Sequence, residues 1–302
     1  MRGSRSFTVA SRLFDRETRE RAWLLYAWCR RCDDLADDQD HGHALGAQAG
    51  AEDRLAIIRQ LTTRAFAAEE TDDPAFDALG VVALETGLTM RMADDVIAGF
   101  ALDAAGWRPR SEADLMRYCY HVAGAVGVMM AVVMGVDPQD GDTLDRACDL
   151  GLAFQLANIA RDIGEDAAAG RCYLPAEWLE QAGIPAGRHM QPAFRPALVP
   201  LAARLAGLAR EHERAARIGA ARLRFRQRWA VLSAAGIYGA IARKVGAAGA
   251  DAWNTRQATG RIEKLGHVAE AFRQALARPR GLERLPRWNR RELARLAAQA
   301  PI

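Results

Sequence analysis

The segment Tyr26-Ala-Trp-Cys-Arg-Arg-Cys-Asp-Asp-Leu-Ala-Asp-Asp38 decides the class of fold. Wound as an α-helix at about 100° per residue, it separates into two opposite faces. The polar face carries Tyr26, Arg30, Asp33 and Asp37. The apolar face carries Leu24, Leu25, Trp28, Cys32 and Leu35. Aspartate is a poor residue inside a helix and like charges four positions apart repel, so the acidic face indicates either a solvated surface or a bound cation.

A second segment, Gln155-Leu-Ala-Asn-Ile-Ala-Arg-Asp-Ile-Gly-Glu-Asp166, repeats the pattern. Its polar face carries Gln155, Asn158, Asp162 and Asp166, and an adjoining apolar stripe carries Leu152, Leu156, Ile159 and Ile163. Two helices that each present carboxylates at positions i and i+4 can face one another and hold hard Mg²⁺ ions, which also bind substrate phosphate. The pair of segments therefore predicts a diphosphate site.

Ionisation of an allylic diphosphate is the chemistry that needs such a site, because negative charge grows on the leaving oxygen. Mg²⁺ can act there as a Lewis acid, and Arg30, Arg161 and Arg171 can add bidentate contacts to the leaving group. The alternative role of each arginine is a salt bridge to a neighbouring aspartate. For Arg171 the two interpretations stay open.

The segment Tyr118-Cys-Tyr-His-Val-Ala-Gly-Ala-Val-Gly-Val-Met-Met130 offers the apolar, polarizable wall that a carbocation needs. One helical face carries Ala123, Gly127, Met130 and Met134. Glycine inside a helix costs about 1 kcal/mol relative to alanine, so Gly124 and Gly127 indicate close approach by another helix or a prenyl chain. His121 is expected to be a hydrogen-bonded structural residue rather than a base.

Composition excludes several classes. Lys and Arg number 41 against 38 Asp and Glu in 302 residues, so a net charge of +3 gives no field for nucleic acid. The five cysteines are irregularly spaced, which indicates a reducing cytoplasm rather than a disulfide framework. Soft-metal clusters, Glu-x-x-His repeats and a nucleophilic Ser or Cys motif are missing from the sequence.

Helical periodicity dominates the chain, which predicts a single all-α domain over residues 1–302. Residues 185–200, with four prolines, form an irregular connection between two helical halves, and the Arg-rich residues 280–302 form a peripheral tail. The apolar run 122–136 is shorter than the roughly 20 residues that span a bilayer. The expected helices cover residues 15–39, 51–69, 74–86, 89–104, 111–136, 141–169, 198–220, 223–248 and 261–277.

The chain resembles the squalene/phytoene synthase family, above all its bacterial members that make phytoene. The resemblance lies in residues 3–11, 26–38, 118–136 and 150–175, and more weakly in residues 237–265. The resemblance implies the isoprenoid synthase fold, with a central active-site cavity between the two Asp-bearing helices. It implies that Asp33, Asp37, Asp162 and Asp166 are catalytic and bind Mg²⁺ or Mn²⁺. It also implies that substrate or diphosphate is contacted by Ser6, Phe7, Tyr26, Arg30, Gln155, Asn158, Arg161, Arg171 and Tyr238.

The activity implied by the resemblance is head-to-head condensation of two geranylgeranyl diphosphates to phytoene through prephytoene diphosphate, in carotenoid biosynthesis. No NADPH is expected. One alternative is a thirty-carbon product, dehydrosqualene or squalene, made from farnesyl diphosphate; the other is a non-catalytic helical assembly factor. The lipophilic substrate and product, with the basic tail, predict a cytoplasmic protein in peripheral contact with the inner membrane and with neighbouring carotenoid enzymes.

Overall fold

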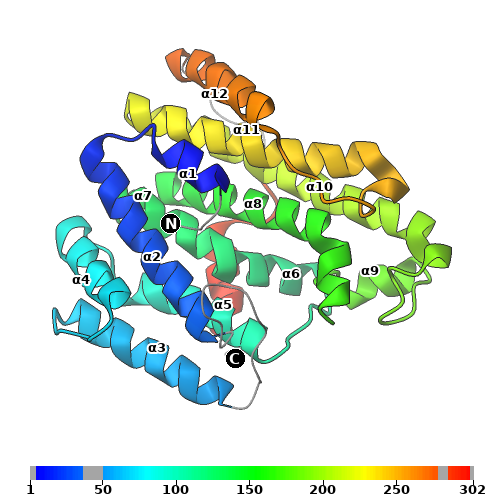
Figure 1. The fold of residues 1–302 in the computed structure, drawn as a ribbon, viewed down its shortest axis with the longest axis horizontal. Coiled ribbons are helices and arrows are strands. Elements are labelled where there is room, and N and C mark those ends of the chain that lie inside the picture. Colours follow the sequence, from blue (N-terminus) through cyan, green and yellow to red (C-terminus); the bar gives the residue numbers. More distant parts are fainter. Residues whose placement is uncertain (1–4, 37–49, 278–284, 300–302) are drawn as a thin grey trace.

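The computed structural model describes residues 5–36, 50–277 and 285–299, and within them the chain is helical without strands (Figure 1). This confirms the all-α prediction. Short 3₁₀ turns η2, η3 and η4 join some of the helices at Pro192–Phe194, Ala220–Arg222 and Gly249–Asp251. The helices are α1 Arg5–Ser11, α2 Arg16–Ala36, α3 Ala51–Phe66, α4 Pro74–Thr86, α5 Met90–Ala104, α6 Glu112–Cys119, α7 Ala125–Val133, α8 Gly141–Ala168, α9 Ala176–Gln181, α10 Arg195–Gly219, α11 Phe225–Ala248, α12 Arg261–Leu276 and α13 Arg290–Gln299.

Helix boundaries follow from capping chemistry. Asp73 accepts a hydrogen bond from the Ala75 amide at the start of α4, and Pro74 occupies its first turn. Gly87 ends the same helix with a φ of 80°, the left-handed conformation that suits glycine. Gly170, with a φ of 73°, follows α8 in the same way. These local signals explain why the expected bounds of α4 and α8 agree with the structure.

Two differences from the expected helices are a π-helical turn and an earlier start of α10. The segment predicted as one helix over residues 111–136 contains a π-helical turn, η1, at Tyr120–Gly124, between α6 and α7. Helix α10 begins at Arg195 rather than 198 and includes Pro200, so the irregular connection is shorter than expected. Proline in the first turn of a helix is tolerated because its missing amide hydrogen has no helical partner there, and Pro200 removes only one hydrogen bond further on.

Helix α8 lies in the middle of the molecule, with α7, η1 and α6 against one part of it and α10 and α11 against another (Figure 1). Close approach between α7 and α8 depends on glycine. A Cβ atom at Gly127 would lie 2.4 Å from the Ala147 carbonyl oxygen, and one at Gly151 would lie 2.1 Å from the Ala123 oxygen. The sequence predicted close approach by either another helix or a prenyl chain, and the close approach of another helix is observed at Gly127.

The predicted apolar faces of both Asp-bearing helices are in the core. Leu25, Trp28 and Cys32 of α2 are fully or almost fully buried, and so are Leu152 and Leu156 of α8. They belong to one hydrophobic cluster to which most of the helices contribute. The segment Glu112–Val133 is long and apolar enough to cross a membrane, but 72% of its most apolar window is buried inside the protein, as in a core helix.

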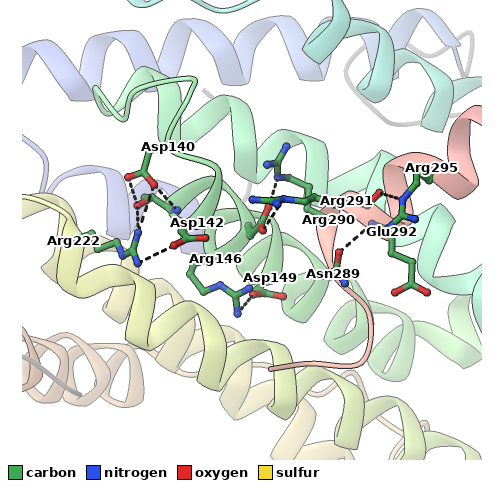
Figure 2. Close-up of polar contacts among 12 residues, drawn as sticks. Asp140, Asp142, Arg146, Asp149, Arg222, Asn289, Arg290, Arg291, Glu292 and Arg295 are labelled. Carbon is green, nitrogen blue, oxygen red and sulfur yellow. Dashed lines mark hydrogen bonds and ion pairs between the residues drawn. The ribbon is translucent and has the colours of Figure 1, made fainter. Parts of the chain in front are cut away.

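The described part of the C-terminal segment is packed on the core rather than peripheral. Leu293 of α13 is completely buried, and the Trp288 indole donates a hydrogen bond of 3.0 Å to Glu112. Arg290 binds Asp145 of α8 at 2.7 Å, within the polar network shown in Figure 2. The tail was expected to be peripheral because it is rich in arginine. Its few apolar residues, among them Trp288 and Leu293, are nevertheless buried against the core.

Candidate active site

A cavity of about 540 Å³ occupies the centre of the helical assembly. Its wall is mostly apolar and comes from α1, α2, α5, α6, η1, α7, α8, α10 and α11 together with adjacent turns. The face expected to surround a carbocation contributes all four of its members to this wall: Ala123, Gly127, Met130 and Met134. His121 does not line the cavity; its Nδ1 lies 2.8 Å from the Asp95 carbonyl oxygen, and burial lowers its pKa, in keeping with a structural role.

Helix α2 brings its polar face to the cavity, with Tyr26, Arg30 and Asp33 in the wall. The Tyr26 ring stacks on Phe7 of α1, with ring centroids 4.8 Å apart, so this short helix is held across the cavity. Arg30 binds Asp33 at 2.6 Å and the buried Asp34 at 2.7 Å. Ser6 belongs to α1, but its side chain lies outside the described part of the structure, and Asp37 lies outside it entirely.

Helix α8 brings Gln155 and Asn158 into the same wall. One turn beyond Asn158, Asp162 is bound by Arg161 at 2.7 and 2.5 Å and by Arg256 at 3.2 Å. Arg256 also binds Glu165, so an arginine from the loop before α12 reaches the acidic end of α8. Arg256 was not predicted from the sequence, because no local pattern marks a residue that chain folding brings to the site.

Asp166 is a buried carboxyl group with other carboxylates nearby. Burial, followed by the charge of Asp162, raises the pKa of Asp166 to about 7, against the opposing effect of Arg171. Glu165 and Asp103 raise this pKa further. A carboxyl group that resists ionisation among other carboxylates is a place where a divalent cation would relieve repulsion.

Asp103 of α5 is a polar residue of the cavity wall that the sequence patterns missed. Its carboxylate accepts hydrogen bonds from Tyr118 at 3.0 and 3.1 Å and from Tyr173 at 2.9 Å. The two tyrosine rings stack with centroids 4.8 Å apart. Asp103 stands alone near the end of its helix, so the only sequence signal was the aromatic residue Tyr118 in an otherwise apolar segment.

Helix α11 contributes Tyr238 to the cavity wall. The Tyr238 ring stacks on Phe154 of α8, with centroids 4.0 Å apart and planes inclined by 20°. Together with Phe7 and Tyr26 this pair places π-faces on two sides of the hollow, and such faces attract positive charge.

The donor set suits a hard divalent ion shared with a ligand. Among the residues that the structure describes, no three His, Cys, Asp or Glu side chains form a complete metal cage. Mg²⁺ does not require one, because it keeps waters and takes one or two carboxylates together with phosphate oxygens. Asp33 on α2 and the carboxylates of Asp162 and Asp166 on α8 fit that requirement.

A helical fold around an apolar cavity, with carboxylates and arginines gathered at one end of α2 and α8, suits an enzyme that acts on prenyl diphosphates. The sequence matches the family model for squalene/phytoene synthase over residues 1–264, and the chain belongs to this family. In structure it is similar to a dehydrosqualene synthase solved with a ligand, with a TM-score of 0.77 and 27% identity over 89% of this chain and 91% of that one. This likeness confirms the isoprenoid synthase fold.

Among characterised relatives, the chain is 48% identical to phytoene synthase of Pseudescherichia vulneris over 94% of both sequences. It is 47% identical to 15-cis-phytoene synthase of Enterobacter agglomerans, over 91% of this chain and 92% of the relative. Against the 15-cis-phytoene synthase of a Paracoccus strain the identity is 42%, over 87% and 85% respectively.

Proposed function

We propose that this protein condenses two geranylgeranyl diphosphates head to head, through prephytoene diphosphate, and releases diphosphate and phytoene for carotenoid biosynthesis. The observation that carries the proposal is one cavity whose mostly apolar wall includes Arg30 and Asp33 of α2 and the amides Gln155 and Asn158 of α8. That polarity matches a molecule with a diphosphate at one end and a hydrocarbon at the other. The relatives named phytoene synthase support the choice of product.

In this proposal Asp33, Asp37, Asp162 and Asp166 hold Mg²⁺ or Mn²⁺ against the diphosphate. When bound, the ion supplies Lewis-acid stabilisation of the charge that grows on the leaving group. Arg30 binds Asp33, Arg161 binds Asp162, and the charge of Arg171 acts on Asp166, so all three arginines can turn to a bound diphosphate. Guanidinium suits this role because its planar donors match phosphate oxygens in pairs.

The remaining residues bind and shield the hydrocarbon. Gln155 and Asn158 can orient the diphosphate end, while the Phe7–Tyr26 and Phe154–Tyr238 pairs present π-faces to positive charge on carbon. We propose that the departing diphosphate accepts the final proton, and that the reaction needs no NADPH. The alternative thirty-carbon products from farnesyl diphosphate would use the same polar residues and differ in the depth of cavity that they fill.

Product analysis tests the proposal. Purified protein is incubated with geranylgeranyl diphosphate or farnesyl diphosphate, each with Mg²⁺ or Mn²⁺ and with or without NADPH, and the hydrocarbons are identified. We expect phytoene from geranylgeranyl diphosphate, unaffected by NADPH. A thirty-carbon hydrocarbon as the main product would favour the alternative substrate, and no condensation with either substrate would favour an assembly factor.

We also propose that the protein works in the cytoplasm in peripheral contact with an anionic membrane, beside enzymes that share its lipophilic substrate and product. Helix α12 supports this contact better than α13, whose Leu293 is buried. Helix α12 lies on the outer side of α11 in Figure 1. Its residues Ile262, Leu265 and Leu276 share one helical face and are 87%, 67% and 67% exposed. Exposed arginines, among them Arg261 and Arg273, flank this stripe and suit anionic headgroups.

Vesicle flotation tests the membrane contact. We expect wild-type protein to float with vesicles that contain anionic lipid, and the variant Ile262→Glu/Leu265→Glu to lose most of this binding. The control is Leu84→Glu on α4, which changes a residue that is 74% exposed on a different helix. Equal flotation of the wild type and the α12 variant would exclude this surface.

A further inference from the structure

A buried ionic triad lies behind the inner end of the cavity, away from the acidic residues of the proposed reaction. Arg146 of α8 lines the cavity, and its Nη1 lies 2.8 Å from the Oδ2 of Asp149. The other oxygen of Asp149 accepts a hydrogen bond of 2.7 Å from Nδ1 of His212 on α10. Only 14% of the Arg146 side chain is exposed, and Asp149 and His212 are 2% and 0% exposed. The chemistry proposed above uses none of these three residues.

The ion pair holds the charged end of Arg146 beside Asp149, although this close approach of Nη1 and Oδ2 lacks hydrogen-bond geometry. Burial opposes the ionisation of Asp149 and raises its pKa, while His212 and Arg146 oppose that effect, so the three groups depend on one another. Figure 2 shows the Arg146 side chain extended toward Asp149, with the Arg222–Asp140 and Arg222–Asp142 contacts close by. The charged end of Arg146 is thus bound to the protein, which leaves its methylene stem available as a wall.

Glycine at position 219 makes room for that stem. A Cβ atom at Gly219 of α10 would lie 2.2 Å from Cβ and 2.4 Å from Cγ of Arg146, far inside contact distance. Gly219 also lines the cavity. The stem of Arg146 therefore fills the space between α8 and α10 at the inner end.

The depth of Arg146 matches the length of one prenyl chain. The α8 residues of the cavity wall run from Asn158 inward past Arg146 to Thr143. The 12 residues of helix from Asn158 to Arg146 span about 18 Å, and Thr143 lies about one turn further on. An extended chain advances about 1.2 Å per bond, or about 5 Å per isoprene unit of four chain atoms. By the same rule a geranylgeranyl chain measures about 19 Å, a farnesyl chain about 14 Å and a twenty-five-carbon chain about 24 Å.

We propose that Arg146, held by Asp149 and His212, is the residue that limits the length of the prenyl chain by meeting its distal end. This inference rests on the proposed function, which places the diphosphate at the Asp162 end of α8. A farnesyl chain would stop short of Arg146 and leave the inner end unfilled. A twenty-five-carbon chain would collide with the Arg146 stem. Arg146 is then a specificity-determining residue, and Asp149 and His212 are positioning residues that act through it.

The test measures turnover of fifteen-, twenty- and twenty-five-carbon allylic diphosphates separately. Arg146→Ala is expected to raise the twenty-five- to twenty-carbon ratio of kcat/KM at least tenfold, while the fifteen- to twenty-carbon ratio changes by less than threefold. Asp149→Asn is expected to move the same ratio in the same direction by a smaller factor, because the arginine is no longer fixed. Gly219→Ala pushes the stem into the cavity and is expected to lower twenty-carbon turnover relative to fifteen-carbon turnover.

Two controls keep the outcome decisive. Arg222→Ala changes a half-exposed arginine that lies near Arg146 but outside the cavity wall, and should leave every ratio unchanged. In Arg146→Ala the buried carboxylate of Asp149 loses its arginine partner, and this could unfold the protein. The double variant Arg146→Ala/Asp149→Asn removes that charge as well. Folding of each is checked by circular dichroism. Unchanged chain-length ratios in folded Arg146→Ala or the double variant would overturn the proposal.

Binding separates this proposal from the proposed function. Calorimetry with the non-ionisable thiolo-diphosphate analogues of the three chain lengths needs no turnover. If wild-type protein binds them but makes no phytoene, the proposed function fails, whereas a shift toward the longest analogue in Arg146→Ala still supports the limit on chain length. If phytoene forms normally but analogue preference is the same in wild type and variant, the proposed function stands and the role of Arg146 is excluded.

Discussion

Arg161 binds the carboxylate of its sequence neighbour Asp162 at two points, with Nε 2.7 Å from Oδ1 and Nη2 2.5 Å from Oδ2. Side chains of adjacent helical residues point in different directions, so this contact requires the arginine to fold back toward the end of α8. The pair is mostly buried, at 15% and 18% exposure. It holds a carboxylate and a guanidinium together about one turn beyond Asn158, which lines the cavity, and in the proposed function either can exchange its partner for a ligand.

Removing the charge of Asp162 should abolish activity without unfolding the protein. Asp162→Asn keeps the shape of the side chain and removes a proposed metal ligand, so we expect a loss of kcat of at least about 10²- to 10³-fold, the usual effect of losing one electrostatic contact to a transition state. The measurement is phytoene formation from geranylgeranyl diphosphate, with circular dichroism as the folding check. Asp142→Asn, at a carboxylate that is 72% exposed and bound only weakly by Arg222, is the matched control. Retained activity in Asp162→Asn would contradict the assignment.

Asp166 should make the stability of the metal-free protein depend on pH. Its pKa is about 7 in the folded protein against 3.8 for the unfolded chain, so the folded state holds the proton across that window. The contribution of this carboxyl to the free energy of unfolding is therefore fully present below about pH 4. It decreases as the pH rises from there and is lost once the pH has passed 7. Asp166→Asn cannot ionise, so its melting temperature relative to wild type should increase between pH 5 and pH 8 in the presence of EDTA. A difference that stays constant with pH would show that Asp166 titrates normally.

Gly151 should be irreplaceable for packing reasons. In Gly151→Ala the new Cβ would lie 2.1 Å from the Ala123 carbonyl oxygen, so α8 and η1 must separate. We expect a loss of about 1–3 kcal/mol or more in the free energy of unfolding, the usual cost of overpacking, despite the better helix propensity of alanine. Gly246→Ala on the exposed side of α11, where no atom lies within 4 Å, is the control and should gain up to about 1 kcal/mol. Urea unfolding measures both, and equal stabilities would contradict the close approach.

The C-terminal helix should contribute to stability rather than only to surface charge. Leu293 is completely buried, so Leu293→Ala is expected to cost about 2–5 kcal/mol through lost burial and a residual cavity. Leu285→Ala, at a leucine that is 64% exposed, should change stability by less than about 0.5 kcal/mol. Thermal unfolding compares the two variants. If both had the same small effect, α13 would not be docked in solution.

Much of the fold was predictable because helix signals are local. The cap at Asp73 and the glycine at position 87 fixed the bounds of α4, and a polar face opposite an apolar one predicted both Asp-bearing helices. The short helices α1, α9 and α13 were missed because they are too short for periodicity to identify them; packing contacts such as Phe7 with Tyr26 accompany them in the structure. The π-helical turn at Tyr120–Gly124 likewise has no local signature that we recognised.

The sequence by itself determined which residues could meet a diphosphate, because carboxylates and amides at four-residue spacing share one face of a helix. Tertiary structure alone decided which residues join them from elsewhere in the chain. Asp103 with its two tyrosines, Arg256 on Asp162 and Arg146 at the inner end all reach the cavity or its polar end through contacts between distant segments. Side-chain periodicity describes one helix at a time, whereas a cavity is defined by the distances between helices, and these depend on packing across the whole core.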